Sequence, residues 1–358
     1  PDGNHLEESG GDGGMKWEKV AIKDICTGIY DGPHATPPLS DTGAIFLGIS
    51  NFNNGRLDFS DIRYISEDDL PKWTKRVIPQ KNDIVFSYEA TLNLYAIIPE
   101  GFRGCLGRRM ALLRVDETKA DYKFLYYYFY SDAWRATVNE NIVLGATVDR
   151  IPLIKFPDFP VELPPLETQH RIADILSAYD DLIENNQKQI KLLEEAARRL
   201  YKEWFVDLRF PGHENTKIVD GVPEGWSKST VGNICKLRKV VITPDKIESN
   251  TPYIGLEHMP RNDICLSMWG KSEEINSNKF IYLKKDVLFG KIRPYFHKVG
   301  FALNDGITST DTMVMVADQN LWGLLLVTVS SDAFVDFSYQ NCKAANPRHV
   351  PAEFRFSS

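Results

Sequence analysis

Hydrophobic and polar positions divide the chain into short apolar runs and one long helical run. Four short runs have the apolar, β-branched character of strands, at residues 82–87, 110–115, 286–289 and 312–316. Two aromatic-rich runs, at residues 122–139 and 321–339, predict helices whose rings pack in a core. The pattern predicts an α+β fold in which the parts outside the long helical run contain more strand than helix.

The longest run extends from residue 167 to about residue 204 and contains neither glycine nor proline. Its side chains repeat with a seven-residue period, which is the signature of a coiled coil. The heptad positions are Leu176, Tyr179, Ile183, Asn186, Ile190, Leu193, Ala197, Leu200 and Trp204. At about 1.5 Å per residue, this helix is roughly 55–60 Å long. A helix that packs on its own domain is the alternative interpretation.

The segments on either side of this helix repeat each other in the same order. Residues 17–26 return at 226–235, residues 46–49 at 253–256, and residues 81–86 at 284–289. Later matches follow, in which residues 131–133 return at 331–333 and residues 148–152 at 348–351. The shared order predicts two homologous mixed α/β modules.

We define module 1 as residues 15–163, the helical spacer as residues 164–210 and module 2 as residues 211–358. Residues 1–14 are rich in glycine and glutamate and are interpreted as the remnant of an expression tag.

Composition excludes some classes of protein. No apolar run approaches the roughly 20 residues of a membrane-spanning helix. The net charge of -7 argues against a protein that coats DNA without specificity. The five cysteines show no Cys-x-x-Cys spacing, which predicts neither a disulfide framework nor a zinc site and favours a cytoplasmic location. Cys26 and Cys235 occupy equivalent repeat positions and are interpreted as packed thiols.

Positive charge is nevertheless clustered in both modules, and a solvated face and a DNA contact surface are both open interpretations. The loop at residues 30–37 also has two interpretations. It can be a structural turn, or it can present hydrogen-bond donors to DNA. The candidate DNA-binding residues are His34, Thr36, Lys72, Lys75, Arg76, Ser87, Tyr88, Thr91, Arg108, Arg109, Lys291, Arg293, Tyr295 and His297.

No catalytic motif has a convincing context. The sequence lacks a glycine-rich cofactor loop, a phosphate loop, a nucleophile elbow and a His-Glu-x-x-His motif. The string at residues 346–348 lacks the second proline and the aromatic residue of a methyltransferase motif. Asp83 and Glu89 lack the Glu-x-Lys continuation of a nuclease and are interpreted as solvated surface acids. We therefore predict no catalytic residue, no bound metal and no cofactor.

Several motifs resemble those of the specificity subunit of type I restriction-modification systems. They are residues 31–37, the Pro-Pro segment at residues 151–172, residues 286–295 and residues 309–311. The resemblance extends from Met15 onward. It implies two target recognition domains that read the halves of a bipartite, asymmetric site on double-stranded DNA. It also implies a noncatalytic chain that docks separate modification and restriction subunits, to which S-adenosylmethionine, ATP and Mg belong.

One departure from the family pattern concerns the spacer. Family members usually carry a second long helix after the second recognition domain, and this sequence stops at Ser358. Four heptads of apolar side chains in water would be costly. We expect the same helix of a second copy, or the modification subunits, to cover them. A truncated product that assembles poorly, and a free-standing DNA-binding or scaffold protein, are the alternatives.

Overall fold

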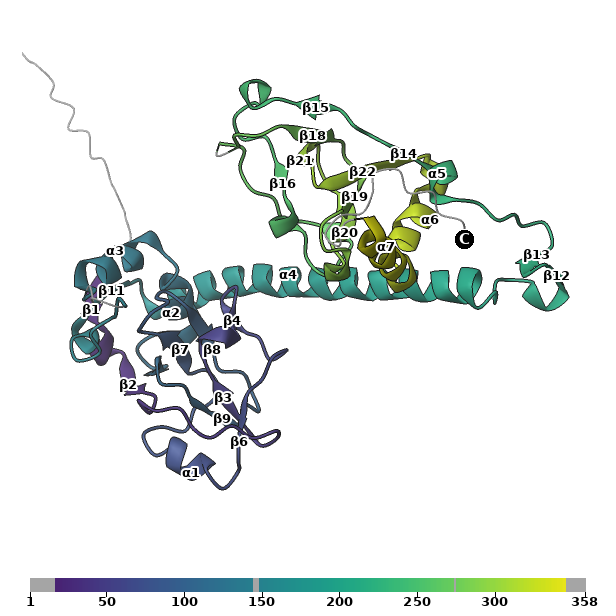
Figure 1. Ribbon diagram of the computed structural model, residues 1–358. Coiled ribbons are helices and arrows are strands. Elements are labelled where there is room, and N and C mark those ends of the chain that lie inside the picture. The colour runs from purple at the N-terminus through teal and green to yellow at the C-terminus, as the bar shows by residue number, and fades with distance from the viewer. Residues whose placement is uncertain (1–16, 144–147, 274, 346–358) are drawn as a thin grey trace, which may run out of the picture. The chain divides into compact units, whose positions relative to one another are not determined.

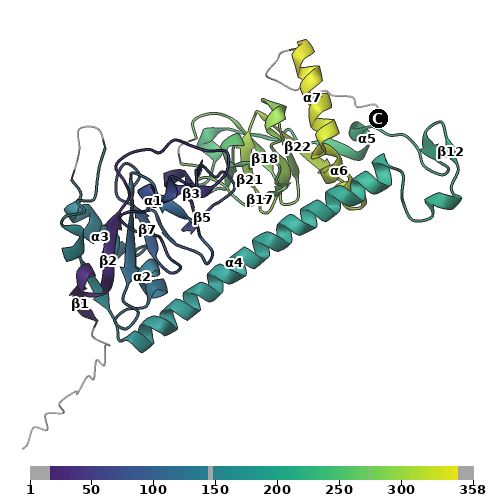
Figure 2. The same cartoon turned by 90° about the horizontal axis from the view of Figure 1, so that it is seen from below.

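The computed structural model describes residues 17–143, 148–273 and 275–345. The chain divides into two units, of which the first ends at Ile183 and the second begins at Glu184. The boundary falls inside the long helix α4, Leu166–Tyr201, drawn in teal in Figures 1 and 2. The α+β fold with a long helix between two modules is confirmed. The finer domain bounds remain predictions, and residues 1–14 lie outside the described residues.

The first unit is built on a four-stranded antiparallel sheet in the order β2-β10-β7-β8. Its strands are β2 (Cys26–Asp31), β10 (Met110–Val115), β7 (Ile84–Ser87) and β8 (Tyr95–Ile97). A second sheet contains β6 (Tyr64–Ile65), β3 (Ala44–Leu47) and β9 (Gly104–Leu106). Two short pairs join β1 (Glu18–Ala21) to β11 (Pro160–Leu163) and β4 (Phe52–Asn53) to β5 (Arg56–Leu57).

Both faces of the four-stranded sheet are covered, which explains why its strands read as continuous apolar runs. Phe86 and Leu113 face a core shared with α2 (Tyr122–Tyr128) and α3 (Asp132–Asn141). Val85 and Leu112 face the opposite way and pack with residues of β3 and β9. Alternation along each strand therefore divides one apolar run between two cores. The short helix α1 (Leu70–Trp73) precedes β7.

The second unit repeats this arrangement. Its main sheet has the order β14-β22-β19-β20-β17, with β14 (Cys235–Leu237), β22 (Thr312–Ala317), β19 (Val287–Gly290), β20 (Val299–Ala302) and β17 (Cys265–Leu266). A second sheet contains β15 (Val241–Ile242), β18 (Lys279–Tyr282), β21 (Gly306–Ser309) and β16 (Tyr253–Ile254). The remaining elements are the pair β12 (Ile218–Val219) and β13 (Val222–Pro223) and the helices α5 (Val231–Ile234), α6 (Gln319–Val329) and α7 (Asp332–Ala345).

The prediction of one aromatic-rich helix in each module is wrong, because each is a pair of helices. In the first module, α2 ends at Tyr128 and the Ser131 hydroxyl accepts the N–H of Trp134 to begin α3. In the second, the Ser331 hydroxyl accepts the N–H of Phe334 at the start of α7. The core role of these helices is confirmed, since Trp134 and Phe334 are buried.

The predicted spacer helix is confirmed within one residue at its start, and a π-helical turn, Lys202–Val206, follows it and contains Trp204. Heptad side chains such as Leu176, Ile183 and Leu193 are exposed. The helix contacts its units elsewhere: Gln169 and Ala173, which precede Leu176, are buried in the first unit, and Glu194 accepts the N–H of Ile264 in the second. Pairing through the heptad positions stays a prediction.

Among the described residues, no single helix has the length and apolar composition to cross a membrane. Two helical segments, Gln319–Val329 and Asp332–Gln340, meet the criteria only when taken together, with a bend of 67° between them.

Candidate nucleic-acid interface

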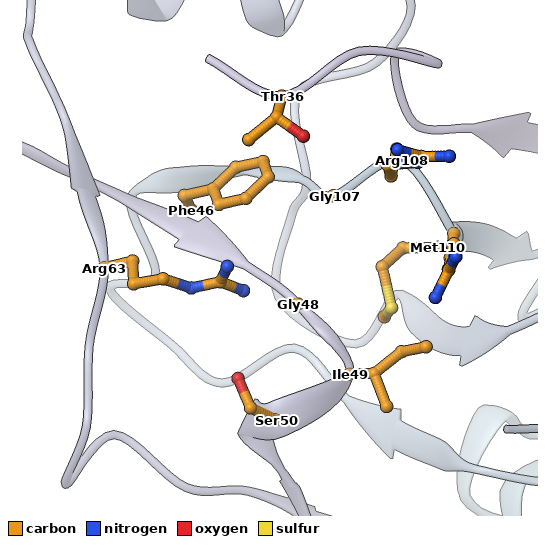
Figure 3. Close-up of a pocket in the computed structure, with 10 residues that line it drawn as sticks. Thr36, Phe46, Gly48, Ile49, Ser50, Arg63, Gly107, Arg108 and Met110 are labelled. Atoms are coloured by element: carbon orange, nitrogen blue, oxygen red, sulfur yellow. The ribbon is translucent and has the colours of Figure 1, made fainter. Parts of the chain in front are cut away.

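A cavity of about 310 Å³ lies in the first unit where the parallel strands β3 and β9 end. Its lining includes Thr36, Arg63 and Arg108 together with the backbone of Gly48 and Gly107 (Figure 3). The N–H of Gly107 donates to the carbonyl of Leu47 at 2.7 Å and closes the floor between the two strands. Loop residues that are distant in the sequence thus meet at one sheet edge.

The two glycines are required by close approaches. A Cβ atom at Gly107 would lie 2.6 Å from the carbonyl oxygen of Leu47. A Cβ atom at Gly48 would lie 2.2 Å from Nη2 of Arg63. The absence of side chains at these positions gives the cavity its floor and leaves room for the Arg63 guanidinium.

Arg63 is the central cation of this cavity, and Figure 3 shows it extending across the cavity toward Gly48. Its Cζ lies 5.0 Å from the ring centroid of Phe46, a side chain that is only 3% exposed. Strand pairing creates this contact, because the N–H of Phe46 donates to the carbonyl of Arg63 at 2.8 Å. Sequence reasoning missed Arg63, since it belongs to no charge cluster and only the register of β3 and β6 places it beside Phe46.

The Tyr88 side chain holds the loops at the rim of the cavity in place and is not positioned to contact a ligand. Its hydroxyl donates to the carbonyl of Arg108 at 2.8 Å and lies 3.4 Å from Nδ1 of His34. Burial raises the pKa of the Tyr88 hydroxyl, so it remains protonated. Ser87 is also buried, and its hydroxyl donates to the carbonyl of Thr91. Both predicted candidates hold the loops in place and are not presented to solvent.

Several other predicted cations are already paired within the protein. Nη1 of Arg76 lies 2.5 Å from a carboxylate oxygen of Asp31, and Nε of Arg109 lies 3.2 Å from Glu89. His34 Nε2 lies 2.9 Å from Asp31. Within the described ranges, no carboxylate is paired with Arg63 or Arg108. The structure brings Thr36, Arg108 and Arg109 together with Arg63.

Lys72 and Lys75 do not line this cavity. Lys72 lies in α1 with Nζ 5.8 Å from the ring centroid of Trp73, and Lys75 is exposed just after that helix. Their role in DNA binding stays a prediction.

The second module presents its predicted residues on the loop after β19. Arg293 and His297 both adopt left-handed backbone conformations, with φ of 52° and 55°. His297 is anchored, since its Nε2 lies 2.7 Å from the carbonyl of Ser330. Burial lowers the pKa of the Lys291 ammonium. Arg293 and Tyr295 are exposed, so they are the members of this set that a partner can reach directly.

Three groups that the sequence singled out, Asp83, Cys26 and Cys235, lie in environments that lower their reactivity. The interpretation of Asp83 as a solvated acid is wrong, because its carboxylate is 2% exposed and accepts two hydrogen bonds from Arg114 at 2.8 Å. Burial raises the pKa of Cys26 to about 12 and that of Cys235 to about 11, which leaves little thiolate near neutral pH. No group of three His, Cys, Asp or Glu side chains is placed to hold a metal ion in the part of the chain that the structure describes.

The sequence of residues 15–195 matches the family described as the type I restriction modification DNA specificity domain. The chain belongs to this family. The match includes module 1 and most of α4, and therefore the cavity around Arg63.

Similar proteins include other specificity-domain proteins. The chain is 25% identical over 246 residues to the type I restriction enzyme MjaIX specificity subunit of Methanocaldococcus jannaschii, which covers 64% of this chain and 54% of that protein. It is 30% identical over 243 residues to the MjaVIII specificity subunit of the same organism, with 67% and 49% covered. The chain thus spans about half the length of the curated relatives it matches.

A solved S subunit of a type I restriction-modification system from M. genitalium has a similar fold. The TM-score is 0.55 at 16% sequence identity, over 96% of this chain and 83% of that one. At this identity, the likeness supports the architecture of two modules and a long helix.

Proposed function

We propose that this chain is the sequence-specific DNA-recognition subunit of a type I restriction-modification enzyme. The observation that carries the proposal is membership of the DNA specificity domain family, combined with a second module that repeats the first in sequence and strand order. Each module reads one half of a split DNA site. Different loop residues on the same frame, at residues 87–93 in one module and 290–297 in the other, suit halves of different sequence.

The proposed role of this chain is recognition without catalysis. The modification subunit transfers the methyl group from S-adenosylmethionine, and the restriction subunit uses ATP and Mg to translocate and cut DNA. Membership of the DNA specificity domain family supports this division. This chain then selects the DNA site, and its partner subunits catalyse methylation and cleavage.

The exposed heptad positions of α4 are the proposed docking surface for a modification subunit or for a second copy of this chain. Leu193 is 70% exposed and Ile183 is 53% exposed. Burial of such side chains against a partner is favourable by roughly 1.5–3 kcal/mol for a fully buried Leu or Ile. The alternative function is a DNA-binding or scaffold protein without an associated enzyme.

The deciding experiment is to express the chain with the modification subunit from its gene neighbourhood in a methylation-free host and to map modified adenines by long-read sequencing. We expect a split motif with a fixed gap that is absent when this chain is omitted. A palindromic split motif would indicate one module type used twice through dimerisation. No methylation, together with DNA binding by the purified chain, would favour the alternative function.

A further inference from the structure

The cavity in module 1 is concave, and its shape restricts the part of a DNA duplex that it can receive. Base edges lie at the floor of grooves about 12 Å and 6 Å wide, where a protruding helix, ribbon or loop reads them. Phosphates lie along the outer ridges of the duplex. A recess at the end of two strands is complementary to a phosphate, and it is poorly shaped to reach a groove floor.

We propose that Arg63, assisted by Arg108, holds one backbone phosphate of DNA in this cavity and so fixes the position of module 1 on the duplex. This inference rests on the DNA recognition proposed above and deepens it by naming the ligand group and the residues. Contacts to phosphate set register and orientation without reading sequence. Base reading is then left to the loops that border the cavity, including residues 32–37.

The charge balance in the cavity favours an anion. Within the described parts of the chain, no carboxylate is paired with Arg63 or Arg108, and both line the cavity. Arg109 also lines it, but Glu89 neutralises its charge at 3.2 Å. Two arginines without anionic partners give the recess a positive charge that attracts a phosphate, and binding of the phosphate releases counterions from the DNA.

Arg63 is held in a geometry suited to phosphate. The buried Phe46 ring lies 5.0 Å from its Cζ and covers one side of the guanidinium. The N–H donors at the edge of a stacked guanidinium remain available, and arginine binds phosphate through two parallel hydrogen bonds. Gly48 leaves the space that the guanidinium occupies. The side chain therefore loses little conformational freedom when the phosphate binds.

The equivalent recess of module 2 has different chemistry. Tyr253 occupies the repeat position of Phe46, and Nζ of Lys279 lies 5.7 Å from its ring centroid. This ammonium already donates to the hydroxyl of Ser277 at 2.6 Å. Two carboxylates, Glu257 and Glu273, also line the recess and offset the positive charge of Lys271 and Lys279. We therefore assign the phosphate anchor to module 1.

The test compares Arg63→Ala with Gly48→Ala, which leaves Arg63 in the sequence but places a methyl group where its guanidinium lies. Gly48 has φ of -125°, a conformation that alanine adopts without strain. Binding of the full chain with its modification subunit is measured against salt concentration. The probes are a duplex with the methylated split motif and a duplex of unrelated sequence. Lys81→Ala, which removes an exposed lysine paired with Glu100, is the charge-matched control.

We expect both variants to weaken binding to the two duplexes by a similar factor. The slope of log K against log salt should fall in magnitude by about 0.9 for one lost phosphate contact. Arg63→Lys should keep most of the slope, and Lys81→Ala should change nothing. A loss confined to one base pair of the motif would assign Arg63 to base reading and overturn the inference.

Unchanged affinity and slope in both variants, with wild-type binding intact, would also overturn this inference and leave the proposed function standing. Failure of the wild-type complex to bind either duplex would instead refute the proposed function, and the phosphate anchor with it.

Discussion

Asp83 forms a buried ion pair with Arg114 in the first unit. We expect removal of this ion pair to lower the free energy of unfolding of that unit. Its Oδ1 accepts from Nε of Arg114 and its Oδ2 from Nη2, both at 2.8 Å. Oδ2 also accepts the backbone N–H of Gln80 at 2.7 Å. The carboxylate therefore ties the turn before β7 to the neighbouring strand β10.

We expect Asp83→Asn to destabilise the first unit by about 3 kcal/mol. Removal of one partner from a buried pair costs roughly 3–5 kcal/mol, because the remaining charge loses its compensation. The Arg114 side chain is 27% exposed, so water can hydrate part of its guanidinium. This partial hydration places the cost at the lower end of the range. The amide would also direct an N–H donor toward a donor on Arg114 or Gln80.

The assay is hydrogen exchange at increasing urea concentration, followed by mass spectrometry of peptides from β7 and β10. Peptides from the second unit report whether the effect stays local. Glu100→Gln removes a carboxylate from the exposed pair with Lys81 and should leave exchange in β7 and β10 unchanged, because exposed pairs contribute little. A cost for Asp83→Asn below about 1 kcal/mol would refute the claim that burial gives this ion pair its importance.

Three further predictions concern partner docking, thiol chemistry and the α2–α4 contact. Leu193→Ser should weaken association with the modification subunit by about 1–2 kcal/mol, or roughly 5- to 30-fold by titration calorimetry, whereas Leu192→Ser, similarly exposed but outside the heptad positions, should not. Cys26 should react with iodoacetamide roughly 1000-fold more slowly in the folded chain than in urea, since its pKa of about 12 leaves little thiolate; equal rates in peptide mass mapping would contradict this. Tyr127→Phe removes a 2.8 Å hydrogen bond to Asp180 and should cost on the order of 1 kcal/mol, seen as faster exchange in the first half of α4.

Local patterns were sufficient for the elements that depend on neighbours in the sequence. Heptad spacing without glycine or proline predicted α4 to within one residue at its start and about three at its end, and short apolar runs predicted β7, β10, β19 and β22. The Ser-Asp-Ala triplets were recognised as a repeat, but their capping role was not. They are the signal that could have divided each aromatic-rich run into two helices.

The candidate site was predicted only in part. A charge cluster identified Arg108 and Arg109, and the loop at residues 30–37 identified Thr36; all three line one cavity. Sequence reasoning also selected Ser87 and Tyr88, whose hydroxyls are occupied within the protein, because a polar residue after a strand looks the same whether it faces solvent or a neighbouring loop.

The sequence by itself determined the repeat, the two-module organisation and the long helix, because the periodicity of apolar residues and the order of the repeated segments are visible in the linear sequence. Tertiary structure alone decided which charges are paired. Asp83 is paired because β10 brings Arg114 to it. Arg63 lies against Phe46 because β6 pairs with β3, and within the described residues no carboxylate is paired with it. Pairing of this kind depends on strand register between distant segments, and a one-residue shift would turn each side chain to the opposite face.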